Sequence, residues 1–285
     1  MSGPTDGYRV DVMTEADVVL AMDWAAAEGW NPGLHDAPCF RAADPGGFLV
    51  GRLDGEPIAT ISVVRYGASF AFLGLYIVAP AHRGNGYGLR LWRAGLARAA
   101  GRTVGLDGVV AQQDNYRKSG FALAYRNIRY QGPGGSATPL DPRIVPLSSR
   151  PRDEVIAYDR PFFPDDRTAF LRAWLAQPRA RGLAIADRRG LAGYGVVRPC
   201  RRGWKVGPLC ADAPELAEAL LAGLAAFVPS DAPLFLDAPE PNAAAVALAE
   251  RRGMTVAFET ARMYAGRAPH LPLRRLFGVT TFELG

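Results

Sequence analysis

The stretch that decides the fold is a continuous segment of fourteen residues: Tyr76-Ile77-Val78-Ala79-Pro80-Ala81-His82-Arg83-Gly84-Asn85-Gly86-Tyr87-Gly88-Leu89. Its apolar first part predicts a strand, and a glycine-rich loop then opens onto a helix predicted at 89–100. The first N–H groups of a helix lack internal partners and carry partial positive charge. Glycines let such a backbone close around a bulky anion. The segment therefore predicts a pyrophosphate site, with Arg83 as a charged donor.

The elements around this segment predict an α+β unit in the first half of the chain. A helix at 14–28 begins with Thr14 and Asp17, which together are typical of a capping box. Asp54-Gly55 predicts a hairpin between strands at 48–53 and 58–65. Further strands are predicted at 8–12, 70–78, 104–110 and 122–130, with a short helix before Gly120.

The second half repeats the same order of elements, which indicates a duplicated unit. Strands are predicted at 183–187, 191–197, 204–209, 234–237 and 255–263, and helices at 154–158, 168–176, 214–227 and 242–253. Residues 131–139 are rich in glycine and proline and predict a linker between the halves. We expect a first domain at 1–132, a linker at 133–142 and a second domain at 143–285.

Two motifs in the first half resemble those of the GNAT acetyltransferase superfamily. The pattern Arg-x-x-Gly-x-Gly at 83–88, after a strand, is similar to the coenzyme A loop of that family. Tyr116, followed by Gly120-Phe121, is similar to its Tyr-x-x-x-Gly-Phe element. The resemblance implies two tandem GNAT-like units, each a mixed, mostly antiparallel sheet flanked by helices.

The resemblance also implies roles for single residues. Acetyl-CoA would be the co-substrate, and Tyr116 would protonate the departing thiolate. Asp107 is the first candidate for the general base, with Asp36 and the terminal carboxylate of Gly285 as alternatives. The acetyl-CoA site would comprise Ile77, Val78, Arg83, Gly84, Asn85, Gly86, Tyr87 and Gly88.

The acceptor is predicted to meet the segment after the first helix. Trp30 offers an aromatic wall there, and Asn31 and Asp36 offer polar groups. The second half has no Arg-x-x-Gly-x-Gly, and Ala249 stands where the tyrosine of the motif would be. We therefore expect a degenerate second unit and a single site, which acts on the primary amine of a small molecule. A protein amine is the second candidate acceptor.

The remaining features exclude several other classes. The glycine-rich loop is not followed by the Gly-Lys-Ser/Thr that a Walker loop requires. Asp107 has roughly the spacing of the acidic residue in a Rossmann unit, but the hairpin before the loop disfavours that fold. The net charge of +5 is spread rather than concentrated, which argues against nucleic-acid binding. The three cysteines are scattered and predict no disulfide, and the three histidines are too far apart to indicate a metal site. The sequence also has no apolar run long enough to predict a membrane span. We expect a cytoplasmic monomer or homodimer, with a non-catalytic acyl-CoA sensor as the alternative function.

Overall fold

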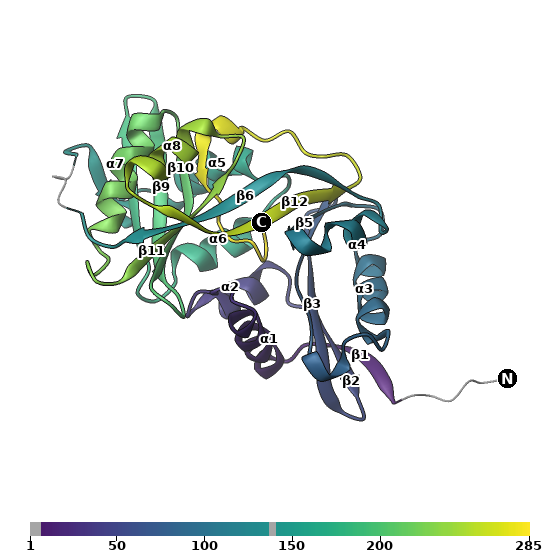
Figure 1. Cartoon of the computed structure of the whole chain (residues 1–285). Helices are drawn as coiled ribbons and strands as arrows, with labels where there is room; N and C mark the ends of the chain where they lie inside the picture. The colour runs from purple at the N-terminus through teal and green to yellow at the C-terminus, as the bar shows by residue number, and fades with distance from the viewer. Residues whose placement is uncertain (1–6, 137–140) are drawn as a thin grey trace.

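A computed structural model describes residues 7–136 and 141–285 of the chain. Figure 1 shows one twisted sheet that runs through both halves, with helices on each face. In the first half the elements are β1 (Tyr8–Val12), α1 (Glu15–Ala27), α2 (Asp36–Ala43), β2 (Phe48–Leu53), β3 (Glu56–Tyr66), β4 (Phe70–Val78), α3 (Tyr87–Arg98), β5 (Thr103–Val109), α4 (Gln113–Arg117) and β6 (Phe121–Pro133).

The second half follows the predicted linker at 133–142, of which residues 137–140 lie outside the described part of the chain. Its elements are β7 (Ile144–Pro146), α5 (Arg152–Asp159), α6 (Thr168–Leu175), β8 (Arg181–Asp187), β9 (Gly190–Pro199), β10 (Trp204–Ala211), α7 (Pro214–Ala225), β11 (Pro233–Pro239), α8 (Ala243–Arg251), β12 (Thr255–Ala265) and β13 (Leu276–Gly278). The predicted strands and helices all occur, with ends that shift by a few residues. Helix α2 and the short strands β7 and β13 were not predicted.

Local sequence explains two of these elements directly. The Thr14 hydroxyl accepts a hydrogen bond from Asp17 N, and the Asp17 carboxylate accepts one from Thr14 N, so α1 begins with the predicted capping box. The hairpin turn between β2 and β3 places Asp54 at φ 50° and Gly55 at φ 94°. Two successive positive φ angles are what a type I′ turn requires, which is why Asp-Gly occurs there.

The two halves exchange their closing strands. Among the described residues the sheet order is β1-β2-β3-β4-β5-β12-β6-β11-β10-β9-β8-β7, with β13 paired to β10. Strand β12 thus lies between β5 and β6, and β6 lies against β11 of the second half. Each half therefore completes its sheet with a strand from the other, and the centre of the molecule belongs to both.

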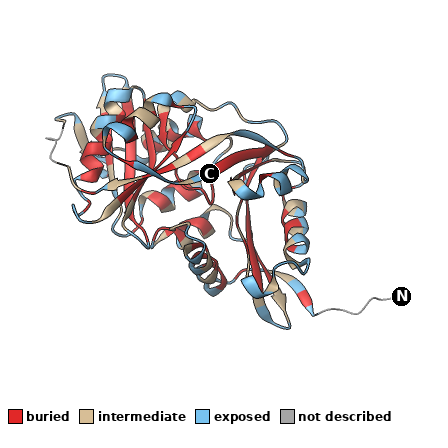
Figure 2. Cartoon of the chain, in the orientation of Figure 1, coloured by how far each residue is buried: buried red, intermediate tan, exposed pale blue. Residues whose placement is uncertain are grey.

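Packing follows the alternation of side chains along the strands. Helices α1 and α2 cover one face of the first-half sheet and α3 covers the other, as Figures 1 and 2 show. In the second half, α7 and α8 pack on one apolar cluster of the sheet. None of the described helices is long and apolar enough to span a membrane.

The C-terminal tail, which we define as residues 279–285, is buried along its whole length. It follows β13 and ends at the junction of the two halves, where Figure 1 marks the C-terminus. The N–H of Gly285 donates to the carbonyl of Thr281 at 3.1 Å, and Tyr66 donates to the carbonyl of Leu284 at 3.2 Å. The tail is therefore docked against the sheet rather than exposed to solvent.

Candidate active site

A bulge in β4 opens a slot between β4 and β5. These strands pair in parallel only from Phe70 to Leu73. Beyond that point Leu75 adopts φ 47°, and the Thr60 hydroxyl donates to its carbonyl at 2.8 Å. A bulge bends its strand and interrupts the ladder. The last residues of β4 and β5 therefore separate, and both line the space between them.

The loop before α3 presents backbone N–H groups to this space. Gly84 and Gly86 have φ 82° and 83°, a region that L side chains rarely adopt. No side chain caps α3, whose first intrahelical bond runs from Arg90 N to Gly86 O at 3.2 Å. Within the described part of the chain, the N–H groups of residues 84–89 have no acceptor. The geometry is that of an anion site at a helix N-terminus.

An open cleft connects this loop with the slot. It contains six of the eight predicted acetyl-CoA residues: Ile77, Val78, Arg83, Gly84, Gly86 and Gly88. Asn85 is not among its lining residues, and neither is Tyr87, whose ring stacks on Tyr8 with centroids 5.1 Å apart. Sequence reasoning missed Arg93 and Lys118, two cations that also line the cleft.

Arg83 lies at the cleft with partners of its own. Its Nε donates to the carbonyl of Val78 at 2.8 Å, and its guanidinium pairs with Glu28. Both members of this ion pair are partly exposed, with side-chain exposures of 50% and 37%. Exposed pairs contribute little stability. Arg83 can therefore exchange Glu28 for a phosphate at small cost.

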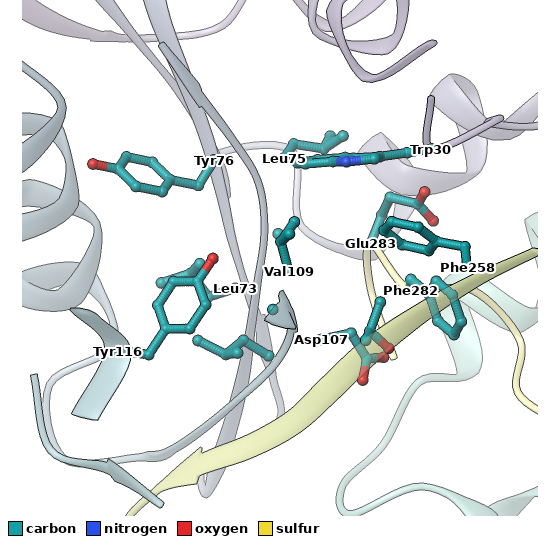
Figure 3. Close-up of a pocket in the computed structure, with 14 residues that line it drawn as sticks. Trp30, Leu73, Leu75, Tyr76, Asp107, Val109, Tyr116, Phe258, Phe282 and Glu283 are labelled. Atoms are coloured by element: carbon teal, nitrogen blue, oxygen red, sulfur yellow. The ribbon is translucent and has the colours of Figure 1, made fainter. Parts of the chain in front are cut away.

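An inner pocket continues the cleft beyond the slot. Trp30, Tyr76, Val109 and Tyr116 line both spaces, so that the two are continuous. Figure 3 shows Tyr76 and Tyr116 on one side, Phe258, Phe282 and Glu283 on the other, and Trp30 beside them. A molecule that extends from the helix N-terminus through the slot would end in this pocket.

Tyr116 stands at the passage between cleft and pocket. Its ring stacks on Trp92 at a centroid distance of 5.6 Å, and a Cβ at residue 108 would lie 2.2 Å from it, so only glycine fits there. Burial, and next the neighbouring Tyr76, raise the pKa of Tyr116 to about 12. The phenol is therefore protonated at neutral pH and can donate a proton.

Asp107 lines the pocket, but its carboxylate is already in use. It accepts hydrogen bonds from Arg262 Nε and Nη2 at 2.8 and 2.6 Å, and from Asn127 Nδ2 at 2.8 Å. The side chain of Asp107 has no exposed surface. Protonation would break a buried ion pair, which is costly. Asp107 is therefore a poor acceptor for the proton of an amine, in contrast to its predicted role as the base.

Comparison with known proteins assigns both halves of the chain to the family that the sequence motifs resemble. Residues 16–121 match the family model "Acetyltransferase (GNAT) family", and residues 155–278 match "Acetyltransferase (GNAT) domain". The holothin acyltransferase of Pseudoalteromonas sp. (strain SANK 73390) is 33% identical over 266 residues, which cover 93% of this chain and 90% of that protein.

The chain belongs to the GNAT acetyltransferase family. It is a tandem GNAT acyltransferase of the predicted α+β class. A crystal structure from Pyrococcus horikoshii, provisionally assigned as an acetyltransferase, superimposes with a TM-score of 0.85 at 24% identity and covers 100% of this chain and 98% of that one. A tandem GNAT protein from the clavulanic acid biosynthesis pathway superimposes with a TM-score of 0.62 at 15% identity, covering 92% and 99%. These two likenesses concern the fold.

The predicted acceptor residues of this GNAT protein do not lie together. Trp30 lines the pocket, whereas Asn31 and Asp36 line neither space. Asn31 exchanges two hydrogen bonds with the backbone of Arg202, at 3.0 and 2.8 Å. Asp36 is fully buried and accepts two hydrogen bonds from Arg198 at 2.8 and 3.1 Å. Both residues fasten the segment after α1 to the second half, and this leaves them no free group for a substrate.

Four pocket residues that sequence reasoning missed come from the C-terminal half: Phe258, Thr260, Phe282 and Glu283. The terminal residue Gly285, an alternative base in the sequence prediction, lies outside the pocket against Phe72. Glu283 reaches it because the tail crosses β4 closely: a Cβ at residue 74 would lie 2.1 Å from the Glu283 carbonyl. The available signal was that Glu283 is the one acidic side chain in an apolar tail.

The second half contains a corresponding slot that is filled. Strands β10 and β11 pair in parallel from Trp204 to Val206 only. Strand β13 then pairs with β10 in the place where the strands separate, and Val279 N donates to Asp237 O on β11 at 2.8 Å. The chain's own C-terminal region thus occupies the second slot.

Proposed function

We propose that this GNAT protein transfers an acetyl group from acetyl-CoA to the primary amine of a small molecule, by direct attack in a ternary complex. The observation that carries this proposal is the continuity of three features. Free amides at the start of α3 suit a pyrophosphate, the slot beside the β4 bulge suits an extended pantetheine arm, and the protonated Tyr116 stands where the two spaces meet.

The helix N-terminus and the glycines would hold the pyrophosphate. Gly84 and Gly86 line the cleft, and their N–H groups have no acceptor among the described residues, so an anion in the cleft can bind them. Arg83 would turn from Glu28 to the phosphates. Arg93 and Lys118 would neutralise further phosphate charge at the rim of the cleft. Asn85 and Tyr87 would contribute their backbone rather than their side chains.

The chemical step needs one acid and one base. The amine nitrogen forms a bond to the thioester carbon, the C–S bond breaks, and the thiolate takes the phenolic proton of Tyr116. The amine loses its own proton to the Glu283 carboxylate, directly or through one water. Glu283 suits this role because it lines the pocket, is 3% exposed, and has no ion-pair partner within 4 Å among the described residues.

The second unit is proposed to bind no acyl-CoA. Strand β13 fills its slot, and α7 begins with Pro214, which has no N–H to offer an anion. Asp212 and Glu215 add negative charge at the same helix end. We propose that the linker at 133–142 separates a first unit that binds acetyl-CoA from a second unit that does not bind it and contributes residues to the inner pocket.

An amine panel with acetyl-CoA as donor tests the proposal, with free coenzyme A and the acylated product measured together. Equal amounts of both products in the wild type, and their loss in Tyr116→Phe, are the expected results. Tight binding of acetyl-CoA without turnover of any amine would contradict the proposal and favour a sensor.

A further inference from the structure

We infer that the acceptor is a flat aromatic primary amine, held between Trp30 and the pair Phe258 and Phe282. This inference rests on the proposed function and specifies its substrate class. The inner pocket has two unlike sides, as Figure 3 shows. Tyr76 and Tyr116 face the slot through which the acyl group would arrive. The opposite side, here called the acceptor wall, consists of Trp30, Phe258, Thr260, Phe282 and Glu283.

The aromatic part of the acceptor wall is built from three separate segments: the loop after α1, strand β12 and the tail. The rings of Phe258 and Phe282 lie 6.5 Å apart and tilted by 42°. Arg129 holds two residues of the acceptor wall in place: it donates to the carbonyl of Trp30 at 2.6 Å, and its guanidinium lies 4.7 Å from the centre of the Phe282 ring. Rings held in place before binding favour a planar aromatic partner.

The charge behind the acceptor wall disfavours polycations. The carboxylate of Glu283 interacts with three buried cations, Arg129, Arg198 and Lys205. Asp237 and Asp36 neutralise the two arginines. Lys205 has no carboxylate within 4 Å among the described residues, and its Nζ donates to the Asn31 carbonyl at 3.0 Å. Three carboxylates, those of Asp36, Asp237 and Glu283, thus face three cations, and this cluster of described residues has no excess negative charge for an additional cation.

The pKa of Lys205 shows the penalty for a cation in this region. Burial first, and then the charge of Arg129, lower that pKa below its usual value. A protonated alkylamine placed between Thr260 and Glu283, both of which are buried, would likewise lose hydration. Alkylamines have pKa values of about 10 and are mostly charged at pH 7. An aromatic amine enters uncharged and is already in the form that can attack the thioester.

The polar groups of the acceptor wall match one NH₂ group. Thr260 is 2% exposed, lines the pocket, and its hydroxyl has no partner among the described residues. A buried hydroxyl without a partner is costly, which indicates that a ligand supplies one. The two N–H groups of a primary amine can donate to Thr260 Oγ1 and to the Glu283 carboxylate. The N–H bond toward Glu283 is the one that breaks during transfer.

The test uses pairs of compounds that differ mainly in ring type. Purified enzyme is assayed with acetyl-CoA and aniline, cyclohexylamine, spermidine or a lysine peptide. The products acetanilide and N-cyclohexylacetamide, both uncharged, are titrated into the enzyme loaded with coenzyme A. We expect acetylation of aniline in preference to the other amines, and at least about tenfold tighter binding of acetanilide, from aromatic contacts alone.

Two variants connect this preference to the acceptor wall. Phe258→Leu should reduce the preference for acetanilide about tenfold, and Thr260→Val should weaken aniline binding. Both should keep the acetyl-CoA affinity of the wild type. Preferential acetylation of spermidine or the peptide, or equal binding of the two amides, would overturn the acceptor class while leaving the transferase activity established. Failure of acetyl-CoA itself to bind would instead overturn the proposed function.

Discussion

The two slots of this tandem GNAT protein share a framework and differ in what occupies them. In each, a strand with a register irregularity pairs in parallel with its neighbour over a few residues and then separates from it. An aspartate on that neighbour faces an arginine from the exchanged closing strand: Asp107 faces Arg262, and Asp237 faces Arg129. Both pairs are bidentate and buried. The first slot opens into the cleft, whereas β13 fills the second.

This difference shows that the repeated fold does not by itself provide a site. The Asp–Arg pair holds the exchanged strands together in both units. The first unit adds unoccupied N–H groups, Tyr116 and open space, and the second adds a strand of its own chain. The tail then runs from the filled second slot to the open first slot, where Glu283 lines the inner pocket. The second unit thus has a filled slot and contributes Phe258, Phe282 and Glu283 to the inner pocket.

The largest expected effect is on kcat, and it should occur in a tyrosine variant at the first slot but not in a matched tyrosine variant in the core of the second half. Tyr116→Phe should lower kcat about 10²–10⁴-fold, because the thiolate loses its proton donor. Tyr130→Phe, in the apolar core of the second half, removes a phenol of the same kind and should leave kcat unchanged. Steady-state release of coenzyme A measures both. Equal losses in the two variants would contradict the assigned acid.

The paired aspartates give the second comparison. Asp107→Asn and Asp237→Asn should each destabilise the fold by about 3–5 kcal/mol, since each leaves a buried arginine without its counterion. Urea unfolding measures this loss. In folded protein at low temperature, Asp107→Asn should also lower kcat, because Asp107 lines the pocket. Asp237→Asn should instead mainly raise the KM for the amine, because it releases Arg129, which holds Trp30 and Phe282. A loss of activity of the same size in Asp237→Asn would show that the two slots are coupled.

Two glycines with positive φ provide a smaller and matched contrast. Gly86 before α3 has φ 83° and Gly253 after α8 has φ 67°, and a Cβ at either would meet nothing within 4 Å. Alanine at either position should cost about 1–2 kcal/mol of stability through backbone strain. Only Gly86→Ala should weaken acetyl-CoA binding, measured by calorimetry. Normal affinity in that variant would argue against the loop as the phosphate site.

Much of the fold could be predicted because its signals are local. Thr14 and Asp17 begin α1, Asp54-Gly55 forms the hairpin, and the glycines at 84–88 open α3. The exchange of β6 and β12 was not predicted, because alternation along a strand does not identify its partner. The three residues of β13 are too few for a periodic pattern.

The sequence predicted most of the proposed coenzyme side of the site, but only Trp30 of the acceptor wall. The loop and Tyr116 belong to continuous motifs, whereas the acceptor wall gathers residues from three distant segments. Asp107 was chosen as a base from its place in an apolar strand, and its partner Arg262 lies 155 residues away. Glu283 reaches the pocket only through the path of the tail. Such long-range pairings leave no local pattern in the sequence.

The smallest effect is on the pH dependence. A raised pKa keeps the donor protonated at higher pH, so Tyr116 should remain an acid up to about pH 12, where an ordinary tyrosine would lose its proton near pH 10. The stability that accompanies this shift is complete below pH 10 and is lost as the pH rises toward 12. A difference ultraviolet titration of wild type against Tyr116→Phe should show the late-titrating tyrosine. A difference centred near pH 10 would contradict this environment.

The stoichiometry of acetyl-CoA binding tests the contrast between the two slots most directly. Calorimetric titration of the wild-type chain should give one molecule of acetyl-CoA per chain, because β13 occupies the second slot. Two molecules per chain, or a single one whose affinity is unaffected by Gly86→Ala, would contradict the account.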